Sequence, residues 1–238
     1  MGSSQLAVEP SGGSGAMFDA IAARYDLLNR ILSMGIDRGW RRAAVRIAKV
    51  PAHGHVLDVA TGTADLAIAI ARATPTATVL GVDPSRGMLA VGQKKLQTLR
   101  WGGRVQLSEG DAQSLPHPDA TFDAVTIAFG IRNVPDRPRA LREMTRVLKP
   151  GGRLVVLELS EPRRGLLGPL ARFHVHHIVP RIGAWLSGAR EYRYLQASIA
   201  AFPDPDSFAS MMRDAGLVDV SFALQTFGVA AIHVGVRA

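Results

Sequence analysis

The sequence predicts an α/β fold built on a mostly parallel sheet with helices on both faces. From residue 55 onward, short apolar segments alternate with amphipathic segments of about ten to fifteen residues, which is typical of strands joined by crossover helices. Glycine and proline mark the joins, as in the run Lys149–Pro150–Gly151–Gly152. Hydrophobic residues make up 47% of the 238 residues, enough for the core that such a sheet needs.

The N-terminal part is predicted to be a tail followed by a helical cap. Gly, Ser and Pro dominate residues 1–16, so this segment is expected to be flexible, and it lacks the pattern of a secretory signal. Apolar residues then recur at a helical spacing of four, three and four at Ile21, Tyr25, Leu28 and Leu32. A second helix is predicted around 38–49. Residues 17–50 are therefore assigned as N-terminal helices of a single domain that spans 17–238.

The remaining elements follow in alternation. Strands are predicted at 55–60, 77–83, 104–112, 122–130 and 151–162, and helices at 64–73, 85–97 and 136–148. Residues 163–201 form a helical, arginine- and histidine-rich insertion that interrupts the pattern. A helix at 206–217 and two strands around a turn at Gly228 complete a seven-stranded sheet whose last strand is antiparallel.

Composition excludes several classes of site and partner. The chain has no Cys, so it forms no disulfide or thiolate metal site, and no other metal site is predicted. Its apolar runs are too short to span a bilayer. The net charge of +8 is carried mainly by Arg, which indicates either an arginine-rich composition or attraction to an acidic surface. Because no basic run is interleaved with aromatic residues, nucleic acid is not an expected partner.

The turn after the first strand, in the stretch "VLDVATGTADLAIAI", is the first candidate site. Ligands of open α/β sheets bind beyond the carboxyl ends of the strands. Gly62 and Thr63 occupy a tight turn there, but neither the G-x-G-x-x-G pattern of dinucleotide sites nor the G-K-[ST] of a P-loop is present. Asp58, just before the turn, would repel a phosphate and attract a cation. S-adenosylmethionine (SAM), a cationic nucleoside without phosphate, suits this turn.

Acids at the next two strand ends extend the candidate cofactor site. Asp83 ends the second strand, where an acid commonly accepts hydrogen bonds from ribose hydroxyls. The third strand leads into Gly110–Asp111–Ala112, where the carboxylate could accept from the adenine amino group. Three acids at successive strand ends, with the glycine turn on the first strand, favour a nucleoside cofactor. A dehydrogenase is disfavoured by Asp58 and by the missing glycine pattern.

Several longer segments carry a resemblance to a known family. "LDVATGTADLA", "GVDPSRGMLAVGQKK" and "LREMTRVLKPGGRLVVLELSEP" resemble a Rossmann-like class I SAM-dependent methyltransferase. "FDAIAARYDLLNRILSMGIDRGWRR", "FGIRNVPD", "FHVHHIVPRIGAW" and "YRYLQASIAAFPD" more narrowly resemble the ubiquinone/menaquinone biosynthesis C-methyltransferases. The likeness covers about residues 17–236.

This resemblance implies SAM-dependent methylation of a ring carbon on a prenylated quinol, with demethylmenaquinol as the favoured substrate. The alternatives are a polyprenyl-methoxybenzoquinol of ubiquinone biosynthesis, another small aromatic acceptor, or a non-enzymatic SAM-binding subunit of a quinone-synthesis assembly. Carried over to this chain, cofactor contacts fall on Thr63, Asp83, Asp111, Ala112 and Ala128.

Two positions depart from the pattern of the family. Ala64 stands where the turn usually has a second glycine, and it is expected to tighten the space under the methionine part of SAM. Asp37 stands where the family usually has His. The second departure bears on the chemistry of the N-terminal part of the site.

Carbon methylation needs a quinol whose hydroxyl has lost its proton. Arg132 is predicted to stabilise the resulting phenolate, with Asn133 as an orienting hydrogen-bond partner; the alternative is that Arg132 pairs with an acid and supports a turn. Candidate bases are Asp37, Tyr25 and His174, with the neighbouring His176 and His177. Water is the alternative proton acceptor.

The prenyl tail of the substrate predicts contact with a membrane. The helices at 17–50 and 163–201 are expected to cover the tail, and Arg41, Arg42, Arg163, Arg164 and Arg172 to touch anionic headgroups. The expected location is cytoplasmic, peripheral to the inner face of the cytoplasmic membrane. A homodimer or a place in a quinone-synthesis assembly stays open.

Overall fold

The computed structural model describes residues 19, 22, 25–27, 30, 33, 35–99, 101, 103–161 and 189–238. The predicted tail at 1–16, much of the first predicted helix and most of the 163–201 insertion lie outside the described residues. Within the described part, no helix is both long and apolar enough to cross a membrane.

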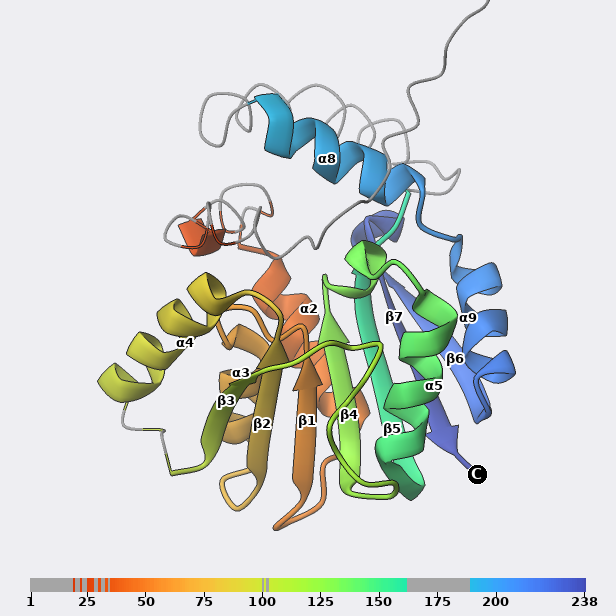
Figure 1. Cartoon of the computed structure of the whole chain (residues 1–238). Helices are drawn as coiled ribbons and strands as arrows, with labels where there is room; N and C mark the ends of the chain where they lie inside the picture. Colours follow the sequence, from red (N-terminus) through yellow and green to blue (C-terminus); the bar gives the residue numbers. More distant parts are fainter. Residues whose placement is uncertain are drawn as a thin grey trace, which may run out of the picture.

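A seven-stranded sheet organises the described chain (Figure 1), in the order β3-β2-β1-β4-β5-β7-β6. The strands are β1 (His55–Val59), β2 (Thr78–Asp83), β3 (Val105–Glu109), β4 (Phe122–Ala128), β5 (Leu148–Leu159), β6 (Leu217–Gln225) and β7 (Ala230–Arg237). The pairs among β1 to β5 are parallel, whereas β7 lies between β5 and β6 and is antiparallel to both. The predicted sheet with an antiparallel last strand is confirmed.

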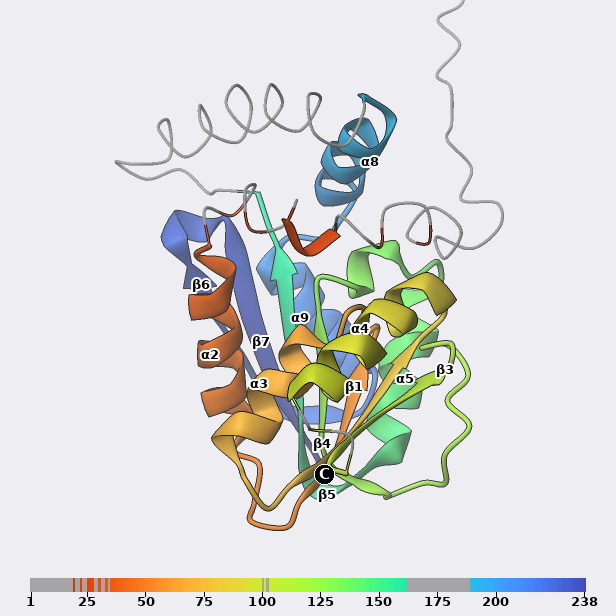
Figure 2. The ribbon, with the colours of Figure 1, turned by 90° about the vertical axis from the view of Figure 1, so that its left-hand side faces the viewer.

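Helices cover both faces of this sheet (Figures 1 and 2). One face carries α2 (Asp37–Ala48), α3 (Asp65–Ala73) and α4 (Arg86–Leu99), and the other carries α5 (Arg137–Val147) and α9 (Pro205–Asp214). Helix α8 (Ala189–Ala200), the described part of the predicted 163–201 insertion, lies beyond the carboxyl ends of the strands. Apolar side chains fill the space between sheet and helices, for example Met144 and Phe208 on one face and Ala44 and Ile70 on the other.

Local sequence explains where these elements begin and end. Asp204 caps α9 by accepting hydrogen bonds from the backbone N–H groups of Asp206 and Ser207. The predicted helix 206–217 ends earlier, at Asp214, because Gly216 takes a left-handed φ of +90° that turns the chain into β6. The strand predicted to start at Gly151 begins at Leu148. In its pairing with β4 the register shifts between Phe122 and Ala124, and the residues of β5 opposite this shift include Gly151 and Gly152.

Strand order reverses at β1, which has β2 on one side and β4 on the other. The chain therefore leaves the ends of β1 and β4 toward opposite faces of the sheet, which creates a crevice between the two connections. Just beyond β4 the backbone at Gly130 passes very close to Ala60, which follows β1, since a methyl group built on Gly130 would lie 2.5 Å from the Ala60 methyl. Glycine is required at this position, and the site is built on the two abutting strand ends.

Candidate active site

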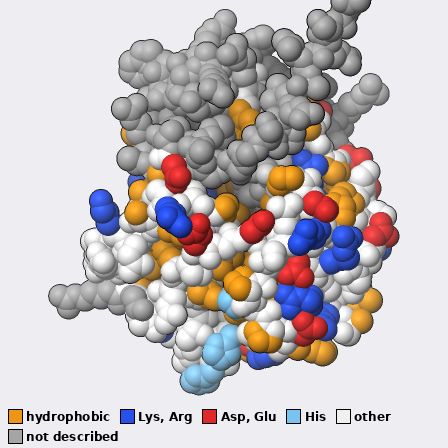
Figure 3. Space-filling model, in the orientation of Figure 1, with side chains coloured by type: hydrophobic (Ala, Val, Ile, Leu, Met, Phe, Trp, Pro, Cys, Tyr) orange, Lys and Arg blue, Asp and Glu red, His pale blue; other side chains and the backbone are white. Residues whose placement is uncertain are grey.

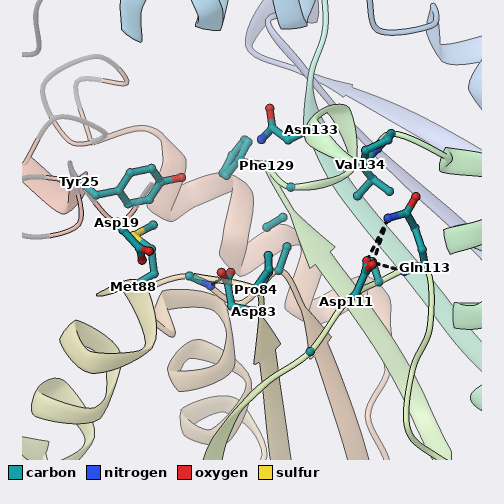
Figure 4. Close-up of a pocket in the computed structure, with 17 residues that line it drawn as sticks. Asp19, Tyr25, Asp83, Pro84, Met88, Asp111, Gln113, Phe129, Asn133 and Val134 are labelled. Atoms are coloured by element: carbon teal, nitrogen blue, oxygen red, sulfur yellow. Dashed lines mark hydrogen bonds between the residues drawn. The ribbon is translucent and has the colours of Figure 1, made fainter. Parts of the chain in front are cut away.

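A cavity of about 480 Å³ opens at the carboxyl ends of β1, β2 and β4, beside the turn that follows β3 (Figure 4). It brings together seven residues that the sequence predicts for the site: Tyr25, Gly62, Asp83, Asp111, Ala112, Ala128 and Asn133. Ala60 and Phe129, which directly follow β1 and β4, have left-handed φ angles of 49° and 59°. The cavity is the candidate active site because it gathers these seven predicted residues at the carboxyl ends of parallel strands, where open α/β sheets bind their ligands.

A second cavity, of about 30 Å³, adjoins the first and shares Tyr25, Ala60, Gly62 and Ala128 with it. It is lined by the two remaining predicted cofactor residues, Asp58 and Thr63, and by Arg41. A carboxylate and a guanidinium that face one small space can hold the ammonium and carboxylate of an amino acid.

Asp83 is fixed at the rim of the large cavity. Its Oδ2 accepts from the backbone N–H of Gly62 at 2.8 Å, and its Oδ1 accepts from the N–H of Ser85 at 2.8 Å. Burial raises the pKa of Asp83, and the two backbone donors partly oppose that rise. Each oxygen keeps a further lone pair for a hydroxyl, so the carboxylate is oriented to accept from a ribose.

Asp58 lies deeper, fully buried at the end of β1. Its two oxygens accept from the hydroxyls of Thr61 and Thr126, both at 2.7 Å. Burial raises the pKa of Asp58 to about 6, although these two hydroxyls and the charge of Arg41 act in the opposite direction. A cation bound in the small cavity would favour the ionised form of this carboxyl.

The raised pKa of Asp58 predicts that SAM binds more weakly as pH falls from 7 to 5, because protonation removes the charge that attracts the ammonium group. The stability of the protein without SAM depends on pH in the opposite sense. Because the pKa of Asp58 in the folded protein exceeds its ordinary value of 3.8, the contribution of this group to the free energy of unfolding is fully present below about pH 4 and is lost as pH rises through about 6. Calorimetric titrations with SAM at several pH values measure the first effect. In Asp58→Asn the loss of affinity at low pH should become smaller, with the remainder due to Asp83, whose pKa is also raised; an unchanged pH dependence would contradict the assignment.

The charges around the large cavity indicate what kind of ligand it holds. Asp19, Asp83 and Asp111 line it, and the described lining residues include no Lys or Arg. An anionic phosphate would therefore meet only repulsion, whereas a cationic, phosphate-free nucleoside fits. The side chains of Met88, Phe129 and Val134 add apolar surface (Figure 4). This donor and acceptor set fits SAM.

Ala64 adopts a left-handed φ of 67° at the start of α3, where glycine is the preferred residue. Its side chain is fully buried and lines neither cavity. A methyl group built on Gly92 of α4 would lie 3.4 Å from the Ala64 methyl, which places that methyl between α3 and α4. The expectation that Ala64 narrows the cofactor space is wrong, because its side chain packs against a helix.

Replacement of Ala64 by Gly should leave SAM affinity within about twofold of the parent. Relief of the left-handed strain, about 1–2 kcal/mol, is offset by loss of a buried methyl, about 0.8 kcal/mol, and by a more flexible unfolded chain. The net change in the free energy of unfolding should lie within about 1 kcal/mol. Calorimetry and urea denaturation test both statements. Ala67→Gly, buried but helical, is the control and should be the more destabilised variant; a large loss of SAM affinity in Ala64→Gly would refute this account.

Arg132 and Asn133 occupy a 3₁₀ turn, η1 (Ile131–Asn133), above the end of β4. The Arg132 side chain is buried, and its Nη1 donates to Glu158 at 2.6 Å and to the carbonyl of Phe129 at 2.7 Å. Asn133 lines the cavity, whereas Arg132 does not. The structure thus places the amide, rather than the guanidinium, next to the space for substrate.

The three candidate bases fall in different places. Tyr25 lines both cavities, and its ring extends toward Phe129 (Figure 4). Asp37 is buried at the start of α2, where it accepts from the Ser33 hydroxyl and pairs with Arg41, and it lines neither cavity. His174 lies outside the described residues.

Two acids that the sequence reasoning missed attach the N-terminal segment to the site. Asp19 accepts from the hydroxyl of Ser85 at 2.5 Å and from the N–H of Gly87 at 2.7 Å. Asp26 accepts from the hydroxyl of Thr63 at 2.6 Å and pairs with Lys95 at 2.5 Å. We call these contacts the N-terminal tether. Both acids lie in the segment "FDAIAARYD", where a helix is predicted. The periodicity of that segment does not indicate which residues its acids contact.

The strand order, the antiparallel β7 and a phosphate-free nucleoside site at the β1 end define a class I SAM-dependent methyltransferase. Solved structures show the same fold: the [4+2]-cyclase SpnF aligns with a TM-score of 0.67 at 19% identity, covering 94% of each chain. A SAM-dependent methyltransferase from Aquifex aeolicus aligns with a TM-score of 0.59 at 16% identity, covering 83% of this chain and 89% of its own.

The chain belongs to the ubiE/COQ5 methyltransferase family, whose model matches residues 10–237. It is 50% identical to a demethylmenaquinone methyltransferase of Thermus thermophilus, over 93% of this chain and 100% of that protein. A relative of the same name from Deinococcus radiodurans is 50% identical over 92% of this chain and 90% of its own. A ubiquinone/menaquinone biosynthesis C-methyltransferase of Geobacter sulfurreducens is 48% identical, over 92% and 86%. The protein is therefore a SAM-dependent methyltransferase, and SAM is its cofactor.

Proposed function

We propose that this protein methylates a ring carbon of demethylmenaquinol and so forms menaquinol. The observation that carries the proposal is the 50% identity to demethylmenaquinone methyltransferases, which for the relative from Thermus thermophilus extends over that protein's full length. A cavity that combines acids for the nucleoside with apolar and aromatic walls supports it. Methylation of a polyprenyl-methoxybenzoquinol, the ubiquinone branch, is the second candidate, because the name of the Geobacter sulfurreducens relative includes both quinones.

The residues of the site divide into those that hold the cofactor and those that serve the quinol. Asp83 would accept from the ribose of bound SAM, Asp111 would face the base, and Asp58 with Arg41 would hold the amino-acid end. When bound, SAM supplies an electrophilic methyl group. The chain must then keep the ring carbon in line with that methyl at about 3–3.5 Å, a separation typical of near-attack geometry.

The quinol oxygen next to the reacting carbon must carry negative charge in the transition state. We assign its stabilisation to the side-chain amide of Asn133, which lines the cavity. Arg132 supports this amide through its buried bonds to Glu158 and to the carbonyl of Phe129. Asp37 is already bonded to Arg41 and Ser33 and lines neither cavity, so it is not the favoured base. Water and Tyr25, which lines both cavities, are the proton acceptors that the described residues leave.

Incubation with isotope-labelled SAM and each demethylated quinol, followed by mass analysis of the lipid, tests the function. Label on menaquinol is the expected result. Label on the benzoquinol alone would move the protein to the ubiquinone branch, and label on neither would refute quinol methylation.

We further propose that the protein binds anionic membranes from the cytoplasmic side, where a prenylated substrate resides. The earlier assignment of Arg41 to headgroup contact is wrong, because its guanidinium is buried and paired with Asp37. Arg38, Arg42 and Arg46, each one turn apart on α2, are exposed instead. By contrast, positive and negative side chains alternate over α5 (Figure 3), where Arg146 pairs with Asp119 and Glu143.

Vesicle flotation with anionic and neutral lipids tests this binding. Arg42→Gln/Arg46→Gln should reduce flotation with anionic vesicles at low salt. Arg139→Gln/Arg142→Gln on α5, with the same change in charge, should not. Equal flotation of both double variants would contradict the role of α2.

A further inference from the structure

We infer that Tyr194, on helix α8, is a positioning residue for methyl transfer: it fixes the side-chain amide of Asn133 so that the amide NH₂ faces the quinol oxygen. This inference rests on the proposed function. It assigns a role to a residue far from Asn133 in sequence, and it makes α8 part of the reacting geometry.

The contact is a hydrogen bond in which the Tyr194 hydroxyl donates to Oδ1 of Asn133 at 3.2 Å. Half-burial raises the pKa of Tyr194, although Arg132 and Arg137 act in the opposite direction, so the hydroxyl stays protonated. A phenol can also accept a hydrogen bond, but the positive charges of these two guanidinium groups attract its lone pairs and favour the hydroxyl as the donor to Asn133. An amide that accepts at its oxygen must turn its nitrogen the other way. Figure 4 shows the Asn133 nitrogen on the side of Phe129 and the cavity, with the oxygen turned away.

The backbone beneath this amide is already fixed. Asn133 donates its N–H to the carbonyl of Gly130 at 3.0 Å. The neighbouring Arg132 is held through both its N–H, at 3.2 Å, and its guanidinium by the buried Glu158. The remaining freedom lies in rotation of the Asn133 amide, whose two ends are similar in shape but opposite in hydrogen-bonding sense.

That rotation decides whether the site helps or opposes the reaction. With NH₂ toward the quinol, the amide donates to an oxygen that gains negative charge. With the amide reversed, carbonyl lone pairs would face the same oxygen and repel it. A single hydroxyl on α8 therefore favours the productive orientation, through the contact that α8 makes with η1.

Tyr194→Phe removes the hydroxyl and keeps the ring. We expect kcat to fall about tenfold, a fraction of the roughly 10²–10³-fold effect of losing an oxyanion donor outright. The rise of rate with pH should move to higher pH, because the phenolate is less stabilised. SAM affinity measured by calorimetry should be unchanged. Ser198→Ala is the matched control, since that hydroxyl bonds within α8 to the carbonyl of Leu195, and it should behave as the parent.

A double-mutant cycle separates a positioning role from general damage. In an Asn133→Ala background, Tyr194→Phe should cost nothing further. An equal tenfold loss in that background, or parental kinetics of Tyr194→Phe alone, would overturn the inference. Tyr194→Gln, which can donate, should be more active than Tyr194→Met, which cannot; this pair answers the question if the Phe variant does not fold. A parent enzyme that labels no quinol would instead refute the proposed function.

Discussion

Replacement of Asp83 by Asn is expected to weaken SAM binding by about 100-fold. A hydrogen bond to a charged acceptor contributes about 1.5–3 kcal/mol and one to a neutral acceptor about 0.5–1.5 kcal/mol, so each of the two ribose bonds loses about 1–1.5 kcal/mol. The amide would also misfit the rim: the carboxylate now accepts from the N–H groups of Gly62 and Ser85, and an Asn side chain has only one oxygen for these two donors. Calorimetric titration with SAM measures the loss.

Asp111→Asn is the matched control for this prediction. Asp111 is exposed and accepts hydrogen bonds from the backbone and side chain of Gln113 (Figure 4), so an amide there leaves fewer groups unsatisfied. We expect a loss of about tenfold or less, the effect of one weakened hydrogen bond. If Asp83→Asn bound SAM within threefold of the parent, the carboxylate would not be the ribose acceptor.

Glu158→Ala is expected to destabilise the protein by about 3–5 kcal/mol, because it leaves the buried guanidinium of Arg132 without its partner. The same carboxylate accepts from the backbone N–H groups of Arg132 and Leu159, which also lose their acceptor. The double variant Arg132→Met/Glu158→Leu removes both charges and should regain much of the stability. Urea denaturation gives the free energies of unfolding.

The effects of Glu158→Ala and Arg132→Met/Glu158→Leu on turnover should differ from their effects on the free energy of unfolding. The double variant should fold yet stay slow, since the support beneath Asn133 is gone. Arg86→Ala, at the exposed pair with Glu109, is the control and should not shift the denaturation midpoint. Near-parental turnover of the double variant would show that the buried pair has no part in positioning Asn133.

The sheet and the acids at its strand ends could be predicted because both follow from local pattern. Alternating periodicity gives the order of elements, and parallel strands place their carboxyl ends at one edge. Asp58, Asp83 and Asp111 then had to lie close to one another, whichever helices covered the sheet. Boundaries next to Gly151 and Gly216 were less predictable, since left-handed glycines let the chain change direction within one residue.

Contacts between distant segments could not be predicted in this way. Arg132 looked free to meet the substrate, but Glu158, on the neighbouring strand β5, takes its guanidinium. Arg41 looked like a surface charge, although the helical face on which it lies is buried. The bond from Tyr194 to Asn133 joins residues 61 positions apart, and no periodicity in either segment indicates it.

The N-terminal tether has a consequence for the order of events in a catalytic cycle. Asp19 and Asp26, on either side of Tyr25 in the sequence, bond to Ser85 and Thr63, which follow the strand ends at the predicted nucleoside site. The cofactor is expected to enter first and its demethylated product to leave last, with departure slower than methyl transfer. If the N-terminal tether slows release of the demethylated cofactor, methylated quinol should form in a burst during the first turnover, followed by a slower steady rate. Because the tether includes the ion pair between Lys95 and Asp26, which salt screens, added salt should raise the steady rate and leave the burst unchanged.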